Sequence, residues 1–182
     1  MAKKGIVIYS SRTGYTKRYA EYLAKELNYA IKPLKHANLF AVSCYPTVIY
    51  GGGLHHNRID GIDGIINGID YFGEQNLIVY SVGLASTNDE LTKEIWLKNF
   101  PEELKGSFLF QTLPGGLARK DCEPGGVMAD KVAFYRQKRD ENKRLTRDNR
   151  IALDIADGVS AEQDRFDTKS CDPIIAAARR HY

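Results

Sequence analysis

Hydroxyl side chains gather at the first predicted strand-to-helix junction. Residues 9–16 read Tyr-Ser-Ser-Arg-Thr-Gly-Tyr-Thr and follow an apolar run that begins at Ile6. The first N–H groups of a helix have no partner inside the helix, and the helix dipole adds about half a positive charge there. Ser and Thr hydroxyls supply further donors, and Gly14 lets a ligand approach the backbone closely. We therefore expect this bend to bind an anion such as a phosphate group.

The expected binding strength does not require a lysine. A hydrogen bond to a charged acceptor contributes about 1.5–3 kcal/mol. The hydroxyls of Ser11, Thr13 and Thr16, together with the N–H groups of residues 12–16, could thus hold a dianion. Arg12 is expected to be exposed, with pairing to the phosphate as the alternative. The alternative interpretation of the whole bend is an ordinary Ser/Thr-rich helix cap without a ligand.

Two further glycine-bearing segments follow predicted strands. Gly51-Gly52-Gly53 comes after the apolar strand of residues 45–50, and Gly83 opens a loop after the strand of residues 76–82. Three successive glycines indicate unusual backbone dihedrals or a close approach by another group. His55 and His56 follow after Leu54, but adjacent residues point apart in regular structure, so a metal site there is disfavoured.

The elements that must position these segments alternate along the chain. Apolar runs predict five strands, at residues 5–9, 29–34, 45–50, 76–82 and 107–113. Helical spacing predicts helices at residues 13–27, 59–72, 88–100, 127–143, 147–156 and 173–180. This alternation is typical of an α/β fold with a parallel sheet and helices on both faces. The loops after the first, third and fourth strands would then lie at one edge of the sheet, where ligands bind.

Composition narrows the class of protein. The chain has 182 residues and a formal net charge of +3, which is too weakly basic to indicate nucleic-acid binding. The apolar run after Lys4 is too short for a signal peptide or a membrane span. Three distant cysteines without a C-x-x-C motif favour a reducing, cytoplasmic location. Neither G-x-G-x-x-G nor a P-loop motif is present. We predict one domain over residues 1–156 and a C-terminal extension over residues 157–182.

The pattern Ser11-x-Thr13-Gly14-x-Thr16 resembles the phosphate loop of flavodoxins, which grips the phosphate of flavin mononucleotide, FMN. The resemblance covers roughly residues 4–156. It implies a flavodoxin-like three-layer α/β/α sandwich around a five-stranded parallel sheet with strand order 2-1-3-4-5. Residues 49–53, 80–84 and 113–117 are similar to a branch that contains menaquinone-dependent protoporphyrinogen oxidases.

The resemblance implies that three segments bind FMN. Residues 10–16 would hold the phosphate, and residues 51–55 and 83–86 would flank the ring. Peptide groups of residues 51–53 would lie against the flavin edge and tune its potential. The predicted cofactor-binding residues are Ser10, Ser11, Arg12, Thr13, Gly14, Tyr15, Thr16, Tyr50, Gly51, Gly52, Gly53, Leu54, His55, Gly83, Leu84, Ala85 and Ser86.

The leading hypothesis is an FMN-dependent oxidoreductase that transfers electrons or hydride between a small substrate or quinone and a redox partner protein. The protein would need no acid–base pair of its own, because the flavin carries the chemistry. Trp96 lies on the apolar face of a predicted helix, so no Trp is left to stack on the flavin. This favours the alternative of a flavodoxin-like binding or regulatory module without flavin. A protoporphyrinogen oxidase proper is a third option.

The expected surroundings of the protein are less defined. No transmembrane segment is predicted, while peripheral membrane contact and a homodimer stay open. The basic stretch of residues 136–150 is expected to be a solvated face, with docking of an acidic partner or a membrane as the alternative.

Overall fold

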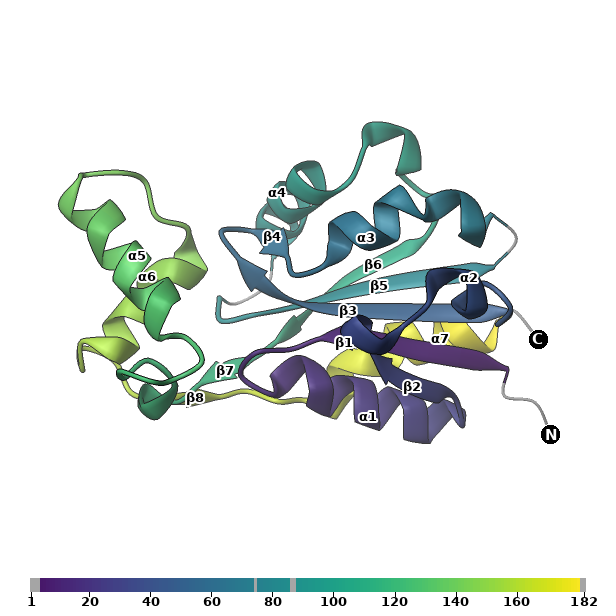
Figure 1. Ribbon diagram of the computed structural model, residues 1–182, viewed down its shortest axis with the longest axis horizontal. Coiled ribbons are helices and arrows are strands. Elements are labelled where there is room, and N and C mark those ends of the chain that lie inside the picture. The colour runs from purple at the N-terminus through teal and green to yellow at the C-terminus, as the bar shows by residue number, and fades with distance from the viewer. Residues whose placement is uncertain (1–3, 74, 86–87, 181–182) are drawn as a thin grey trace.

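The computed structural model describes residues 4–73, 75–85 and 88–180 and contains a central parallel sheet (Figure 1). Its strand order is β2-β1-β3-β5-β6. The strands are β1 (Gly5–Ser10), β2 (Ala30–Pro33), β3 (Thr47–His55), β5 (Asn76–Gly83) and β6 (Leu109–Pro114). In order of appearance these are strands 2-1-3-4-5, so the predicted fold class and order are confirmed. β2 lies at one edge, which suits Pro33, because proline cannot donate to a second neighbour.

Three short strands were not predicted. β4 (Arg58–Ile59) turns back antiparallel on the end of β3. β7 (Gly116–Leu117) and β8 (Gln163–Asp164) form a separate two-stranded sheet beyond β6. Strands of two residues carry no periodicity that sequence analysis could detect.

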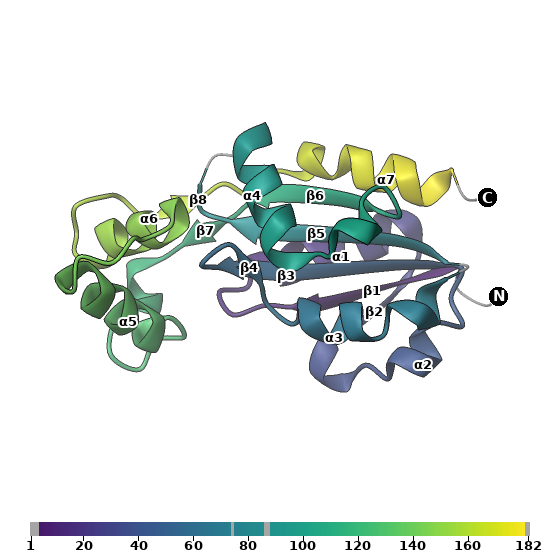
Figure 2. The ribbon, with the colours of Figure 1, turned by 90° about the horizontal axis from the view of Figure 1, so that it is seen from above.

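Helices cover both faces of the sheet (Figures 1 and 2). On one face lie α1 (Tyr15–Leu27) and α7 (Asp172–Arg179), and on the other lie α2 (Leu39–Val42), α3 (Ile62–Asn67) and α4 (Asp89–Asn99). The Asn88 side chain accepts a hydrogen bond from the Leu91 N–H and caps α4, the helix predicted over residues 88–100. Short 3₁₀ turns occupy Leu34–His36, Ile69–Phe72, Glu102–Leu104, Arg119–Asp121 and Thr168–Cys171.

The strands read as continuous apolar runs because both faces of the sheet are buried. In β1, Ile6 and Ile8 pack into the layer of α3 and α4, while Val7 packs toward α1 and α7. This follows from the alternation of side chains along a strand. Trp96 packs against Phe100 and Phe108 in the core on the α3 and α4 side of the sheet, as predicted.

The prediction that the third strand ends at Tyr50 is wrong. β3 continues through the glycines to His55, and Gly51 pairs with Tyr9 on one side and Tyr80 on the other. A Cβ atom at Gly51 would overlap the Tyr80 ring. The glycines therefore serve close packing within the strand rather than a loop.

The predicted helix over residues 59–72 is also shorter than expected. Ile59 belongs to β4, and Gly61 has a φ of 76°, so α3 begins only at Ile62. Between β6 and α7 the chain forms a helical hairpin of α5 (Ala129–Asp140) and α6 (Arg147–Ala156), here called the α5–α6 hairpin. It has its own small apolar core and lies beyond the carboxyl ends of the parallel strands (Figures 1 and 2).

Candidate functional site

The bend between β1 and α1 presents donors that nothing in the described chain satisfies. Gly14 precedes α1 with a φ of 90°, a left-handed conformation that favours glycine. Among the described residues, none accepts a hydrogen bond from the N–H of Thr13, Tyr15 or Thr16. The Ser11 hydroxyl oxygen is buried and also lacks a partner in the part of the chain described. A buried polar group left unpaired costs about 1–3 kcal/mol, so the Ser11 hydroxyl is an unsatisfied donor at the start of α1.

The sheet supports this bend from below. Tyr80 of β5 is fully buried, and its hydroxyl donates a hydrogen bond of 3.1 Å to the Thr16 carbonyl. Burial raises the pKa of Tyr80 well above its ordinary value, so the hydroxyl remains a neutral donor. The Thr16 hydroxyl oxygen lies 3.8 Å from the position that a Cβ at Gly53 would take. The first helix and the glycine-bearing end of β3 are therefore in close contact.

Three predicted segments meet around one small cavity of about 50 Å³. The bend lies on one side, the ends of β3 and β5 lie on the next, and the segment after β6 closes the site. The cavity is lined by Arg12, Thr13, Tyr15, Thr16, Gly53, Leu54, His55, Val82, Gly83, Leu84, Gly115, Gly116, Leu117, Met128 and Asp148. Nine predicted site residues are in this set: Arg12, Thr13, Tyr15, Thr16, Gly53, Leu54, His55, Gly83 and Leu84.

The other predicted site residues do not line the cavity. Tyr50 is fully buried in the core, where its hydroxyl donates to the Asp60 carbonyl, so it offers no contact to a ring. Ala85 is a buried residue of the loop after β5, and Ser86 lies outside the described residues. The remaining predicted residues belong to the backbone around the cavity rather than its lining: Ser10, Ser11, Gly14, Gly51 and Gly52.

The peptide groups of residues 51–53, expected at the flavin edge, are held in the sheet. Gly51 and Gly52 pair with β1 and β5, Gly53 pairs with β5, and the Gly53 carbonyl accepts a hydrogen bond of 2.9 Å from the Asp60 N–H. Rotating one of these peptide groups would break hydrogen bonds of the strand.

A carboxylate organises the rim of the cavity. Asp60 Oδ2 accepts a hydrogen bond of 2.9 Å from Arg12 Nε and lies 3.3 Å from His55 Nε2. Burial acts to raise the pKa of Asp60, but the hydrogen bonds from His55 and Arg12 outweigh it and hold the pKa below its ordinary value. Arg12 thus pairs with Asp60, and its side chain is 44% exposed, in line with the expected exposure.

The α5–α6 hairpin reaches into the site through a buried acid. Asp148 is 4% exposed and accepts hydrogen bonds from the N–H of Leu84 at 2.7 Å and of Ala85 at 2.9 Å. Burial raises the pKa of Asp148, and the two N–H groups oppose this rise. The Arg165 guanidinium donates to the Leu84 carbonyl, so the loop after β5 is held from two sides. A Cβ at Gly83 would lie 2.8 Å from Asp148 Oδ2 and would crowd it.

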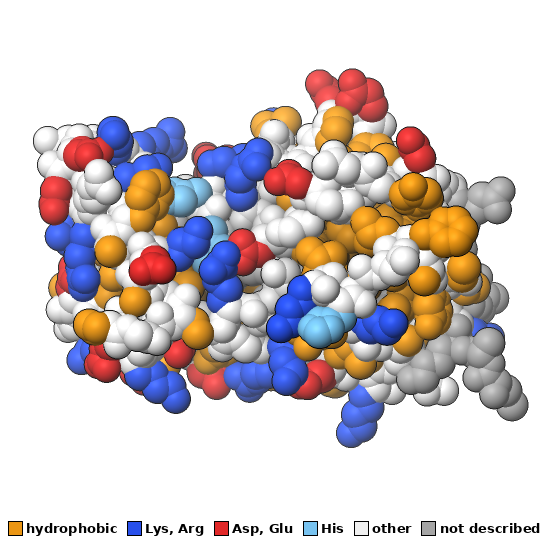
Figure 3. Space-filling view, in the orientation of Figure 1, with side chains coloured by type: hydrophobic (Ala, Val, Ile, Leu, Met, Phe, Trp, Pro, Cys, Tyr) orange, Lys and Arg blue, Asp and Glu red, His pale blue; other side chains and the backbone are white. Residues whose placement is uncertain are grey.

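The two neighbouring histidines also contact the hairpin. The Tyr135 hydroxyl lies 3.4 Å from His55 Nδ1, and the Asn149 amide nitrogen lies 2.6 Å from His56 Nδ1. Burial, followed by the charges of Lys138, Lys98 and Lys131, lowers the pKa of His56 to about 4. A neutral His56 can accept the Asn149 N–H, which fits this contact. Figure 3 shows His side chains at the seam between hairpin and sheet, with Lys and Arg side chains around them.

Sequence analysis missed several residues of this site. Gly116 lies within residues 113–117 of the resemblance but was not among the predicted site residues, yet a Cβ there would overlap the Tyr15 ring. Asp60 and Met128 carried no motif. Asp148 stands in the first turn of α6, where an acid is ordinarily explained by the helix dipole, so its sequence position gave no signal of a distant contact.

The described residues offer some groups for binding and lack others. No group of three or more His, Cys, Asp or Glu side chains that could hold a metal ion occurs in the described ranges. Within the same ranges, no helix is both long and apolar enough to cross a membrane. What the site does offer is an unsatisfied set of hydroxyl and N–H donors next to a narrow apolar space between Leu54 and Leu84.

Comparisons with solved structures find similarity to flavodoxins and flavoproteins at low sequence identity. A flavoprotein from Bacteroides eggerthii is 14% identical, with 61% of this chain and 86% of that chain covered and a TM-score of 0.44. A flavodoxin from the domain Archaea is 14% identical, with 85% and 97% covered and a TM-score of 0.43. Flavodoxin 1 from Bacillus cereus is 13% identical, with 60% and 82% covered and a TM-score of 0.42.

A search of curated proteins finds no match. The family comparison is more specific. A family model described as a flavodoxin domain matches residues 6–123, which span β1, the bend after it and all five strands of the parallel sheet. The chain belongs to the flavodoxin domain family.

Proposed function

We propose that this chain binds FMN at the cavity and works as an oxidoreductase between a small substrate or quinone and a redox partner protein. The observation that carries the proposal is the set of unpaired donors in the first bend, above all the buried Ser11 hydroxyl. Membership of the flavodoxin domain family supports a flavin as the ligand. Bound FMN would accept electrons from a donor and pass them to an acceptor.

The residues of the bend have the chemistry that a phosphate dianion requires. Ser11, Thr13 and Thr16 would donate hydroxyl hydrogen bonds, and the N–H groups at the start of α1 would donate along the helix axis. Leu54 and Leu84 would flank the ring, and His55 would stand at its edge. Asp60 would keep Arg12 at the rim, where it adds positive charge near the phosphate.

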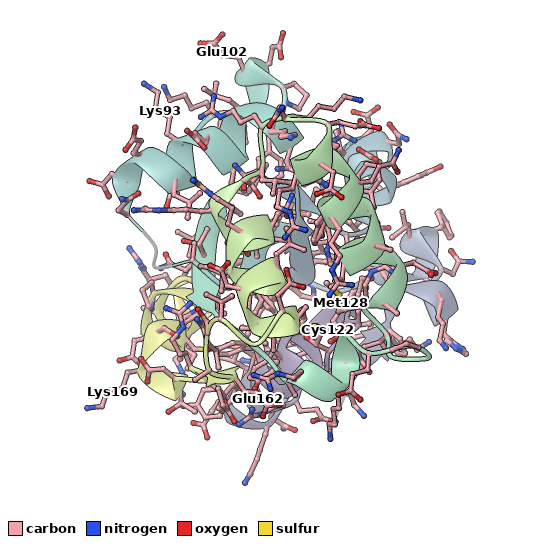
Figure 4. The ribbon with its side chains drawn as sticks, turned by 90° about the vertical axis from the view of Figure 1, so that its left-hand side faces the viewer. Lys93, Glu102, Cys122, Met128, Glu162 and Lys169 are labelled. Carbon is pink, nitrogen blue, oxygen red and sulfur yellow. The ribbon has the colours of Figure 1, made fainter. Side chains whose placement is uncertain are left out.

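The ring side of the site is nearly closed in this structure. Its volume of about 50 Å³ is well below the roughly 300–1,000 Å³ usual for ligand pockets. Met128 and Asp148 line the side of the cavity next to the hairpin, and Figure 4 shows Met128 beside Cys122 at the base of that hairpin. FMN binding therefore requires Met128 and the Asp148 side chain to move aside locally, with the Asp148 hydrogen bonds to Leu84 and Ala85 released or rearranged.

A fluorescence titration tests the proposal. FMN fluorescence should be quenched on addition of the protein, and Gly14→Val should weaken binding at least about tenfold, because a β-branched residue at a φ of 90° distorts the bend. Gly106→Val is the matched control, since Gly106 has a φ of 85°, equally open surroundings and a position before β6, at the other end of the strands. Absence of FMN binding by the unmodified protein would reject the proposal.

A second function is favoured by the closure of the cavity. Because Asp148 already satisfies the Leu84 and Ala85 N–H groups, the chain could act as a flavodoxin-like binding or regulatory module without flavin. This alternative predicts that FMN leaves the melting temperature unchanged.

A further inference from the structure

A second and much larger hollow lies beside the cavity. It has a volume of about 720 Å³ and is bounded by the turn between β3 and β4, by α4, and by the connection between α5 and α6. We call it the basic groove. It is lined by His56, Asn57, Asn88, Glu90, Leu91, Glu94, Leu97, Lys98, Lys138, Arg144, Leu145, Thr146, Arg147 and Arg150.

The lining of the basic groove is strongly positive. It includes five Lys or Arg side chains and two Glu side chains, an excess of three positive charges. The formal net charge of the whole chain is also +3, so the rest of the chain is balanced. Figure 3 shows Lys and Arg side chains on both sides of the seam between the hairpin and the sheet. Charge of one sign inside a concave surface attracts ligands of the opposite sign.

The cations of the groove are not neutralised by the protein. Within the described residues, none of Lys98, Lys138, Arg144, Arg147 and Arg150 has a carboxylate within 4 Å. Other basic residues of the same hairpin do form ion pairs. Arg136 and Arg139 both pair with Asp157, at 2.7 and 3.0 Å. Lys138, Arg144, Arg147 and Arg150 of the hairpin therefore face the groove without an ion pair to a described residue.

A buried acceptor in the same wall also lacks a partner. Asn57 is 8% exposed, and its Nδ2 donates to Glu94 at 3.2 Å, while its Oδ1 is buried without a hydrogen bond in the described structure. The neighbouring His56 is affected by the positive charge around the groove. Burial and then the charges of Lys138, Lys98 and Lys131 lower its pKa to about 4. A ligand that fits this wall would carry negative charge.

The groove and the cavity share a thin wall. His55 and His56 are consecutive, and they line the cavity and the groove respectively. Asp148 and Arg147 are also consecutive, and Asp148 lines the cavity while Arg147 lines the groove. His56 and Asn57, with φ values of 54° and 59°, form the two-residue turn between β3 and β4. A molecule held in the groove would therefore lie next to whatever occupies the cavity.

We propose that the basic groove binds the anionic part of the substrate that reacts at the cavity, a small molecule with at least two carboxylate or phosphate charges. The role as a substrate site rests on the proposed function, whereas the binding of anions does not. A concave site of this volume favours a small molecule over the flat surface of a protein partner. Arg147 and Arg150 of α6 would make the principal contacts with the anionic groups.

Isothermal titration calorimetry on FMN-saturated protein tests this inference, since FMN then fills the competing phosphate bend. The probes are inorganic pyrophosphate and citrate, which separate a preference for phosphate from one for carboxylate. The double variant Arg147→Gln/Arg150→Gln should bind the preferred probe at least about tenfold more weakly. The matched control Lys17→Gln/Lys25→Gln removes two charges from α1, away from the groove, and should bind as the unmodified protein does.

A second measurement keeps the test independent of flavin. NMR titration of His56 should show its pKa rising when the probe binds and staying low in the double variant. If the protein does not take up FMN, the same titrations with Gly14→Val, whose bend is distorted, still test the groove. Failure of the proposed function and failure of this inference are then separate results. No binding of either probe, equal binding by the double variant, or binding only to phosphatidylserine vesicles would overturn the inference.

Discussion

The sheet with its covering helices and the α5–α6 hairpin are held together by different forces. The sheet buries apolar side chains on both faces, and its core residues are almost fully enclosed. The hairpin has a small core of its own and meets the sheet largely through polar contacts, from Asp148 to the loop after β5 and from Tyr135 and Asn149 to the two histidines. Apolar burial is not directional, whereas hydrogen bonds can be exchanged for those of a ligand or water.

This difference divides the candidate site into a fixed half and a movable half. The donors of the first bend lie between β1 and α1 and in the first turn of α1, whose Thr16 carbonyl is held by the Tyr80 hydroxyl. The ring side depends on the hairpin, because Met128 and Asp148 line it. We expect substitutions in the sheet to change the stability of the whole protein, and substitutions at the hairpin contacts to change local opening.

The largest effect is expected in the strand beneath the bend. Gly51→Ala should lower the free energy of unfolding by about 3 kcal/mol, because its methyl group would overlap the buried Tyr80 ring and the core cannot relax easily. Gly64→Ala is the control, since α3 has open space there and alanine should add up to about 1 kcal/mol. Urea denaturation measures both. Equal stability of the two variants would contradict the close packing of β3 on Tyr80.

An intermediate effect is expected at the hairpin contact. Asp148→Ala leaves the Leu84 and Ala85 N–H groups without an acceptor, and a loss of about 1–3 kcal/mol is expected for such groups. Amide hydrogen exchange at residues 84 and 85 should accelerate by about tenfold or more, while the exchange of β1 and β3 stays unchanged. Asp154→Ala, on the exposed side of the same helix, should leave hydrogen exchange unchanged at residues 84 and 85, in β1 and in β3. Acceleration throughout the sheet would show that hairpin and sheet open together.

The smallest effect is a pH dependence at the seam. The pKa of His56 is about 4 in the folded protein and 6.5 in its ordinary range, so the unfolded chain binds more protons between these values. Stability should therefore fall as the pH drops from about 6.5 to about 4, and His56→Gln should remove this part of the slope. The low pKa of Asp60 acts at still lower pH and is common to both proteins. If the stability of His56→Gln depends on pH in the same way as that of the unmodified protein, the pKa of His56 is not lowered in the folded state.

Much of the sheet could be predicted from local patterns. The strands Gly5–Ser10 and Asn76–Gly83 are mostly apolar, and Asn88 is a residue type that caps helices. These local patterns were sufficient to predict the two strands and the start of α4. The glycines after Tyr50 misled the prediction. Whether a glycine interrupts a strand or admits a neighbouring side chain depends on Tyr80, about 30 residues away in the chain. Such a contact leaves no local trace.

The candidate site was predictable only where a single loop builds it. The unsatisfied donors of residues 11–16 follow from the order of hydroxyls and glycine at a helix start. The contacts of Asp148 depend on how two distant segments dock, and no spacing encodes that. The paired histidines were correctly expected to point apart, yet their separate partners, Asp60 and Asn149, emerge only from the tertiary structure.

The most direct test of the central claim is to compare the affinities of the protein for FMN and for riboflavin, which lacks the phosphate. If the bend of residues 11–16 binds the phosphate, several hydrogen bonds of about 1.5–3 kcal/mol each are lost with riboflavin. We predict that FMN binds at least about 100-fold more tightly, and that Ser11→Ala narrows this ratio. Equal affinities for the two flavins would contradict the account, because the unpaired donors of the bend would then hold no phosphate.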